Sequence, residues 1–395
     1  MFFVFGDYAL DVSRRELRRG SELVAVEPQV FDLLVYLMQN RDRVVSKDDL
    51  LQVIWGGRIV SESTLTSRIN AARRAVGDSG EQQALIRTIA RKGIRFVGTV
   101  CETRTATANE AAPVAGSLRQ DIHFCIAPDG VRIAYAEVGR GPPLVKTANW
   151  LNHLEYDWQS PVWKHLLDAL AANHRLVRYD ARGNGLSDWE VADISFEAFV
   201  RDLESVVEAT RLRRFPLLGM SQGCAVSVAY TVRHPERVSH LVLYGGFTRG
   251  RRKRGSAVDV EQSEAFLTLM RHGWGQENPA FRQIFTSLFM PGGSAEQMQW
   301  FNDLQRITTS PDNAARLRQA VDVIDVSDLL PRVRAPTLVL HCRDDAVQPF
   351  EEGRRLAAGI PGARFVALEG RNHALLHGDP GWYRFFDELR SFLKG

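Results

Sequence analysis

Cysteine is scarce in this chain of 395 residues. The four cysteines lie far apart, at positions 101, 125, 224 and 342, and no two have the C-x-x-C spacing of a metal or redox site. This excludes a small secreted domain held together by disulfides, and it favours reduced thiols in a cytoplasmic protein. We expect no metal ion and no cofactor.

Long apolar runs are also absent. No segment approaches the roughly 20 consecutive apolar residues that a membrane-spanning helix needs. Residues 1–5 are apolar, but Gly6 and Asp7 end the run and no basic segment comes before it. We therefore expect no signal peptide and no membrane partner.

An excess of one charge sign is nearly absent too, with 50 Lys and Arg against 47 Asp and Glu. Residues 1–100 hold 15 of the basic and 12 of the acidic residues, so the whole excess falls in the first quarter of the chain. An excess of three is weak evidence for nucleic-acid binding, and the local placement of the basic residues is more informative.

Residues 1–100 have the pattern of a small domain with a sheet at its start and a hairpin at its end. Short alternating segments separated by turns predict strands at 3–5, 8–12, 16–18 and 23–26. Three helices are expected next: one beginning near Pro28, one capped by Ser46, and one from 64 to about 76. Residues 86–97 predict a hairpin around a basic, glycine-containing tip.

This order of elements resembles the winged-helix DNA-binding domain of the OmpR/PhoB response-regulator class, which is also found in CadC-like regulators. The resemblance covers nearly all of residues 1–100. It includes the Leu-Leu-Gln-Val-Ile-Trp-Gly segment at 50–56 and the hairpin, or wing, at 88–96. It implies binding to double-stranded DNA, with the third helix as the recognition helix.

Basic and polar side chains gather on the third helix and at the wing tip. We expect DNA contacts from Thr66, Ser67, Arg68, Asn70, Arg73, Arg74, Arg91 and Lys92. Arg68 and Asn70 are candidates for base edges, because arginine can pair with guanine and asparagine with adenine through two hydrogen bonds. Arg73 and Arg74 are expected to be exposed and to contact phosphates. The alternative, an ordinary solvated face, is disfavoured because these positions coincide with the helix and wing that such a fold presents to DNA.

A second domain is expected after a linker. Residues 101–120 are rich in Thr and Ala and show no apolar periodicity, which predicts a flexible linker. From residue 121 to 395, strand and helix patterns alternate, with strands expected at 122–126, 131–138, 144–145, 175–179, 215–218, 239–244, 337–341 and 364–368. Such alternation implies an α/β fold with a mostly parallel sheet covered by helices on both faces.

The sequence Gly-Met-Ser-Gln-Gly at 219–223 follows one of these strands directly. An apolar pattern with helical spacing comes after it, at 224–232. A G-x-S-x-G segment between a strand and a helix is typical of a nucleophile elbow, a sharp turn that exposes the serine hydroxyl. We therefore take Ser221 as a candidate nucleophile.

A serine nucleophile needs a base to remove its proton and an acid to orient that base. Asp344 and Asp345 follow the strand expected at 337–341, and His373 follows the strand expected at 364–368. The chain order Ser, Asp, His and the positions after strand ends both fit a triad on a parallel sheet.

These features resemble the α/β-hydrolase superfamily over essentially all of residues 121–395, and the Asp-x-Arg-Gly-x-Gly-x-Ser-Asp segment at 180–188 adds to the resemblance. The resemblance implies Ser221 as nucleophile, Asp345 as orienting acid and His373 as general base. Asp344 is the alternative acid, but the Asp-x-x-x-Pro spacing favours Asp345.

An oxyanion hole needs two backbone N–H donors. The residue after the nucleophile, Gln222, would supply one. The second would come from the loop after the strand at 144–145, where the family usually has His-Gly and this chain has Thr-Ala-Asn-Trp at 147–150. Trp150 or Asn149 is the candidate.

The interval 247–330 is too long for a plain connection between two strands. It is rich in aromatic and large apolar residues: Phe266, Leu269, Met270, Trp274, Phe281, Phe285, Phe289, Trp300 and Phe301. We expect a helical lid over Ser221 that lines an apolar pocket. The alternative is that these side chains only pack the lid onto the domain.

Three functional hypotheses follow. The first is a transcription regulator, expected to be a homodimer on paired half-sites, whose hydrolase-like domain senses a small apolar ester, lactone or acyl compound. The second is an active serine hydrolase with an accessory DNA-binding domain. The third is that slow turnover of the bound compound resets the sensor.

Overall fold

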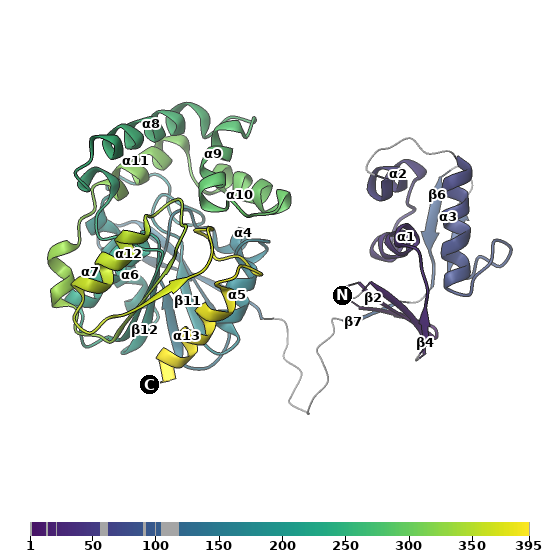
Figure 1. Cartoon of the computed structure of the whole chain (residues 1–395), viewed down its shortest axis with the longest axis horizontal. Helices are drawn as coiled ribbons and strands as arrows, with labels where there is room; N and C mark the ends of the chain where they lie inside the picture. Colours follow the sequence, from purple (N-terminus) through teal and green to yellow (C-terminus); the bar gives the residue numbers. More distant parts are fainter. Residues whose placement is uncertain are drawn as a thin grey trace. The chain divides into compact units, whose positions relative to one another are not determined.

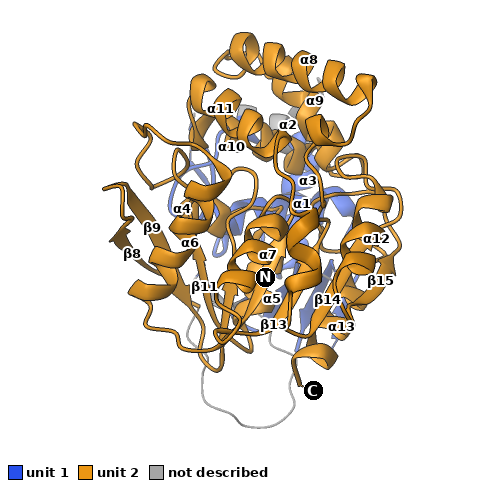
Figure 2. Ribbon diagram, turned by 90° about the vertical axis from the view of Figure 1, so that its left-hand side faces the viewer, with its two compact units in different colours: residues 1–113 blue, residues 114–395 orange. Residues whose placement is uncertain are grey.

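The structure, a computed structural model, describes residues 2–12, 15–20, 22–55, 62–89, 92–98, 100–103 and 118–394. It divides into two compact units, Met1–Pro113 and Val114–Gly395 (Figure 2). Each unit has its own hydrophobic core. The boundary falls within the expected linker, and residues 104–117 of that linker lie outside the described residues.

The first unit contains an antiparallel sheet in the order β4-β3-β2-β1-β7. Its strands are β1 (Phe2–Phe5), β2 (Tyr8–Asp11), β3 (Glu16–Arg19), β4 (Glu22–Val24) and β7 (Cys101–Thr103). The first four follow the prediction. Residues 101–103, however, do not belong to a linker as expected, because they pair with β1. The pairing partner of this strand lies about 100 residues earlier in the chain, so the local sequence pattern does not reveal it.

Three helices of this unit are α1 (Pro28–Gln39), α2 (Lys47–Trp55) and α3 (Glu62–Ala75). Helix α1 begins at Pro28, as predicted. Ser46 caps α2, because the Asp49 N–H donates to Ser46 Oγ at 3.0 Å and the Ser46 N–H donates to Asp49 Oδ2 at 3.2 Å. Buried side chains such as Phe31 and Leu65 pack α1 and α3 into one core.

The wing is the hairpin of β5 (Ile86–Ile89) and β6 (Gly93–Phe96). Val45 bridges to Ile94, which ties the connection between α1 and α2 to the wing. Gly93 has a φ of 138°, and a Cβ there would lie 2.0 Å from the Val45 carbonyl oxygen, so no larger residue fits. The predicted winged-helix fold is confirmed.

The second unit is built on an eight-stranded sheet in the order β15-β14-β13-β12-β10-β11-β9-β8. Its strands are β8 (Asp121–Ile126), β9 (Arg132–Val138), β10 (Pro143–Lys146), β11 (Arg175–Tyr179), β12 (Phe215–Met220), β13 (Val238–Tyr244), β14 (Thr337–Cys342) and β15 (Arg364–Leu368). The pairs β8–β9 and β9–β11 are antiparallel, and the others are parallel. The predicted mostly parallel sheet is confirmed.

Helices cover both faces of this sheet (Figure 1). On one side lie α6 (Phe196–Ala209), α7 (Gly223–Arg233) and α12 (Phe350–Gly359), and on the other lie α5 (Lys164–Ala171) and α13 (Trp382–Lys394). A short helix that the sequence analysis did not predict, α4 (Leu154–Trp158), follows β10. Between these layers the central strands are shielded from water, and β14 is buried along its whole length.

The interval 247–330 is helical, as predicted. It contains η1 (Arg251–Lys253), α8 (Ala257–Gly273), α9 (Ala280–Phe289), α10 (Ala295–Thr308), α11 (Pro311–Asp322) and η2 (Ser327–Arg332). Helices α8 to α11, here called the lid segment, gather at one end of the unit (Figure 1).

Candidate functional site

Ser221 stands at the apex of the turn between β12 and α7. Its φ is 53°, in the left-handed region that residues with a Cβ rarely adopt. Its N–H donates to the carbonyl oxygen of Tyr244, on the neighbouring strand β13, at 2.9 Å. The predicted sharp turn is therefore present, and it is held by a bond to the next strand.

Gly219 and Gly223 flank the serine because neither position has room for a side chain. A Cβ at 219 would lie 2.8 Å from the Cα of Cys224, and a Cβ at 223 would lie 2.5 Å from Thr147 Oγ1 and 2.7 Å from the Ala148 carbonyl oxygen. The spacing of the motif thus follows from the close approach of β12, α7 and the loop after β10.

His373 and Asp345 lie together at the carboxyl ends of β15 and β14. The His373 Nδ1 is 2.7 Å from Asp345 Oδ2, and the side chains are 5% and 1% exposed. Because Nδ1 faces the carboxylate, Nε2 is left to accept a proton. Within residues 118–394 the Ser221 hydroxyl makes no hydrogen bond, and such contacts often tighten only with a ligand bound. Asp344, the alternative acid, is exposed.

The Asp345 carboxylate is stabilised in its charged form. Oδ1 accepts two backbone N–H groups, and that of Gln348 is 2.9 Å away. Burial by itself would raise the pKa of Asp345. The charge and hydrogen bond of His373, the charge of His341 and the Gln348 N–H outweigh burial, so the pKa lies below its usual value.

Two residues that the sequence analysis missed, Gly245 and His341, lie against the Asp345–His373 pair. Gly245 has a φ of 58°, and a Cβ there would press on the His373 ring, 3.2 Å from Cε1. His341, on β14, is buried, with Nε2 3.0 Å from the Gln348 carbonyl oxygen and 3.8 Å from Asp345 Oδ2. The available signal was a histidine inside an otherwise apolar strand.

The lid segment contacts His373 directly. The carbonyl oxygen of Phe289, the last residue of α9, accepts the N–H of His373 at 2.9 Å and that of Ala374 at 3.1 Å. The Phe289 ring stands edge-on to the imidazole, with 5.2 Å between centroids. The Gly292 N–H donates to Asn372 Oδ1 at 2.8 Å. A movement of α9 would therefore disturb His373.

The other lid aromatics mainly pack on one another. Trp274 lies edge-on to Trp150, with 6.2 Å between centroids, and Phe285 packs between Trp274 and Phe266. Ser221 and His373 are only 9% and 5% exposed. Both residues are therefore largely shielded from solvent.

The predicted oxyanion donors are the N–H groups of Gln222 and Trp150. In the continuous stretch 118–394, neither N–H donates to another group. Asn149, the alternative to Trp150, is already engaged, because its N–H donates to a side chain of the same loop at 3.0 Å. This loop lies against the elbow, and Thr147 Oγ1 donates to the Gly223 carbonyl oxygen at 3.2 Å.

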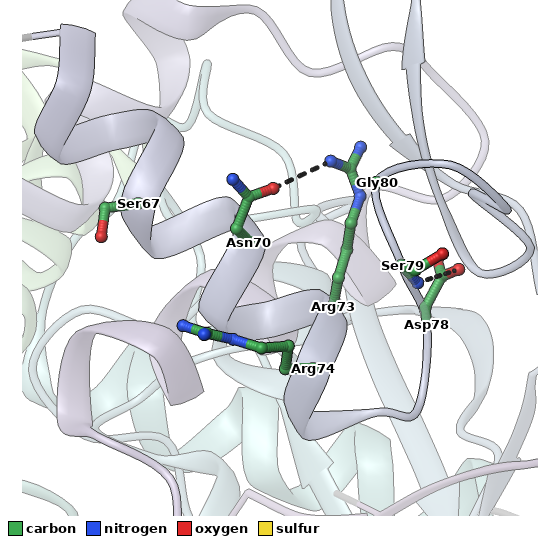
Figure 3. A pocket seen from close by; sticks show the side chains of 7 residues that line it. All are labelled: Ser67, Asn70, Arg73, Arg74, Asp78, Ser79 and Gly80. Atoms are coloured by element: carbon green, nitrogen blue, oxygen red, sulfur yellow. Dashed lines mark hydrogen bonds between the residues drawn. The ribbon is translucent and has the colours of Figure 1, made fainter.

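The predicted DNA contacts fall on α3 and the wing. Thr66, Ser67, Asn70, Arg74 and Lys92 are exposed, and Arg91 lies outside the described residues. A groove of about 670 Å³ between α3 and the wing includes Thr66, Asn70 and Lys92. A second hollow of about 430 Å³ is lined by Ser67, Asn70 and Arg74 (Figure 3).

Arg73 is not exposed, and that expectation was wrong. It is 6% exposed, and its guanidinium donates to the Ile86 carbonyl oxygen at 3.1 Å, to Thr88 Oγ1 at 2.8 Å and to Asn70 Oδ1 at 3.3 Å. Figure 3 shows it turned toward Asn70 while Arg74 extends away from it. The return of the chain into β5 covers this side of α3, which helical periodicity alone does not reveal.

Arg68, the other base-contact candidate, is partly buried. Its guanidinium forms an ion pair with Glu27, the residue before α1. To contact a base edge, the Arg68 guanidinium would therefore have to share or give up its ion pair with Glu27.

The described residues offer neither a metal site nor a membrane-spanning helix. Among the described residues, no group of three His, Cys, Asp or Glu side chains could hold a metal ion. In the same part of the chain, no helix has the length and apolar character to cross a membrane.

Comparison with known proteins matches the two units to two families. Residues 20–96 match the family described as transcriptional regulatory protein, C terminal. Residues 156–380, more than half of the chain, match the family described as alpha/beta hydrolase fold.

Individual relatives align with the second unit. The chain is 28% identical over 267 residues to a pyrrolizixenacetamide deacetylase of Xenorhabdus hominickii, covering 66% of this chain and 94% of the relative. It is 27% identical over 242 residues to a pimeloyl-(acyl-carrier protein) methyl ester esterase of Nitrosomonas europaea, covering 60% and 90%. A hydrolase structure from Pseudomonas aeruginosa superposes with a TM-score of 0.58 at 24% identity, covering 70% and 99%. The chain therefore belongs to the alpha/beta hydrolase fold family and also contains, at residues 20–96, an OmpR/PhoB-type DNA-binding domain of the transcriptional regulators.

Proposed function

We propose that this protein is a transcription regulator whose hydrolase unit senses a small, mainly apolar ester, lactone or acyl compound and hydrolyses it slowly. One observation is central to the proposal. A single chain contains a DNA-binding domain and a unit in which Asp345 and His373 lie 2.7 Å apart, while the Ser221 N–H bonds to Tyr244, the neighbour of the Gly245 that borders the His373 ring. The unit proposed to sense the compound and the domain proposed to bind DNA thus belong to one chain.

Hydrolysis would use these residues in their usual roles. His373 Nε2 takes the proton of the Ser221 hydroxyl as its oxygen attacks the acyl carbon, and Asp345 stabilises the resulting imidazolium. The N–H groups of Gln222 and Trp150 face the negative oxygen of the tetrahedral intermediate. His373 then gives the proton to the leaving oxygen, and water releases the acid by the reverse sequence.

Sensing requires that the compound favour one arrangement of the protein over another. The Phe289 carbonyl oxygen of α9 accepts the His373 N–H, so a compound that binds next to His373 would shift this part of the lid segment, and the bound state would differ from the free one. The names of the relatives, a deacetylase and a methyl ester esterase, support an acyl compound as the input. We further propose a cytoplasmic homodimer that reads paired half-sites.

The second candidate is an active serine hydrolase with an accessory DNA-binding domain. The Asp345–His373 pair favours it, because a binding pocket alone has no need of a general base. A serine-reactive fluorophosphonate probe, applied to the wild type and to Ser221→Ala, separates binding from reactivity. If the wild type is not labelled, hydrolysis is excluded.

A panel of acyl esters and lactones then ranks the two candidates. Hydrolysis and binding to a genomic DNA library are measured in the same preparation. The regulator predicts at least one compound that changes DNA binding. Rapid hydrolysis of many compounds with no change in DNA binding would favour the enzyme.

A further inference from the structure

Four charged side chains are buried together beneath the loop that follows β10. Lys146 ends β10, Arg178 lies on β11, Asp157 lies on α4, and Asp180 follows β11. Their exposed fractions are 5%, 4%, 4% and 0%. Burying charges is costly unless they are paired, and apolar residues often replace such groups without loss of stability. The proposed hydrolysis assigns them no role.

Lys146 connects this cluster to the loop. Its Nζ donates to Asn149 Oδ1 at 2.5 Å and to the Thr147 carbonyl oxygen at 3.4 Å. Arg178 forms an ion pair with Asp157 at 3.5 Å. The ammonium group is therefore directed at the loop that faces the Ser221 turn.

Asn149 and Asn152 then fix the course of the loop. The Asn149 N–H donates to Asn152 Oδ1 at 3.0 Å, and Asn149 Nδ2 donates to the Trp150 carbonyl oxygen at 3.2 Å. Leu151 has a φ of 54°, a conformation that costs free energy unless the surroundings impose it. Side chains of the loop thus hold a backbone that is strained at one residue.

The cluster is not fully satisfied. Asp157 Oδ1, Asp180 Oδ1 and Arg178 Nε are buried without a hydrogen-bond partner within 118–394. Each such atom costs free energy. Local arrangements that sacrifice stability occur most often where function requires them.

We propose that Lys146 and Asn149 are positioning residues that hold the Trp150 N–H toward the oxygen of an acyl group attacked by Ser221. They would replace the His-Gly pair usual at this place. The inference rests on the proposed hydrolysis. It explains why a lysine ends an apolar strand and why the loop bonds to its own side chains.

The charge of Lys146 should be sensitive to pH. Burial, the largest effect, lowers the pKa of Lys146, and the nearby charge of Arg178 lowers it further. Asp157, Asp180 and Cys224 raise it, but the net shift is downward. Burial also raises the pKa of Asp180 to about 7. Because neutral Lys146 is a weaker donor to Asn149, turnover should decrease as the pH rises through the lowered pKa of Lys146.

Turnover of p-nitrophenyl butyrate by the full-length protein tests the inference. The variants are Asn149→Ala, Lys146→Met and, as a control that removes a buried hydroxyl elsewhere, Thr210→Val, whose Oγ1 bonds only within α6. We expect kcat to decrease about tenfold or more in the first two variants, with KM within about threefold. We also expect Lys146→Met to lose the alkaline decrease in kcat between pH 6 and 10. Asn149→Ala leaves the four buried charges intact, so it still tests the positioning role if Lys146→Met does not fold.

Amide hydrogen exchange of the peptide 147–153 provides a second readout. We expect it to be at least tenfold faster in Asn149→Ala than in Thr210→Val. If both loop variants hydrolyse within twofold of the wild type while Ser221→Ala is inactive, the positioning inference is overturned and the proposed function stands. If the wild type shows no Ser221-dependent turnover, the proposed hydrolysis is wrong, and hydrogen exchange alone tests the positioning role. Equal exchange rates of peptide 147–153 in Asn149→Ala and Thr210→Val would overturn that role. Faster exchange in Asn149→Ala would support it.

Discussion

At the scale of single residues, the Asp345 carboxylate is fixed by hydrogen bonds from His373 and from two backbone N–H groups. Its pKa is lowered, so the carboxylate remains charged even below its usual pKa, and the pair with His373 is lost only as the pH falls through the lowered value. We predict that Asp345→Asn reduces kcat/KM for p-nitrophenyl butyrate by about 10³-fold or more, because the imidazolium loses its counter-charge. Asp344→Asn, on the exposed neighbour, should remain within twofold, and a similar loss in both variants would contradict the assignment.

Arg73 and Arg74 are adjacent in sequence, but Arg73 is buried and Arg74 is exposed, so we expect them to differ in role. Arg73→Met should destabilise the full-length protein by about 1–3 kcal/mol in urea unfolding, because the buried carbonyl oxygen of Ile86 loses its donor and the bond to the exposed Thr88 hydroxyl is lost as well.

Arg74→Met should leave unfolding unchanged and reduce the slope of log K against log salt for a labelled 30-base-pair duplex by about one. An unchanged salt slope in Arg74→Met, or a reduced slope in a folded Arg73→Met, would reverse these roles.

At the scale of elements, the approach of β12, α7 and the β10 loop depends on glycine. We predict that Gly223→Ala destabilises the protein by about 1–3 kcal/mol and slows fluorophosphonate labelling of Ser221, because its Cβ would overlap Thr147 and Ala148. Gly130→Ala is the matched control, since its φ is 85° but nothing lies within 4 Å of a Cβ there. It should lose stability without slower labelling, and equal slowing in both would refute the packing argument.

The elements differ in how well their sequence predicts them. Strands and helices of the second unit follow the prediction closely, because buried parallel strands are apolar runs bounded by turns. Ser221, Asp345 and His373 could be predicted because strand ends place them. The contacts of Arg73, His341 and Lys146 could not, because they depend on what another part of the chain brings against them. β7 was missed because its pairing partner, β1, is about 100 residues away.

At the scale of the whole molecule, the two units have separate hydrophobic cores. The core clusters formed by the described residues each belong to one unit. We predict that a chain beginning at residue 114 keeps its thermal transition within about 2 °C of the corresponding transition of the full chain, and keeps Ser221 labelling within twofold. A large loss of either would show that the second unit depends on the first.

The central claim is that occupation of the Ser221 site changes DNA binding. The most direct test is to label Ser221 with a fluorophosphonate and to measure the affinity of the full-length protein for its selected genomic DNA before and after labelling. A coupling of ordinary size predicts a change of about fivefold or more in Kd, in either direction, and no change in Ser221→Ala treated in the same way. Complete labelling of the wild type with an unchanged Kd would contradict the account.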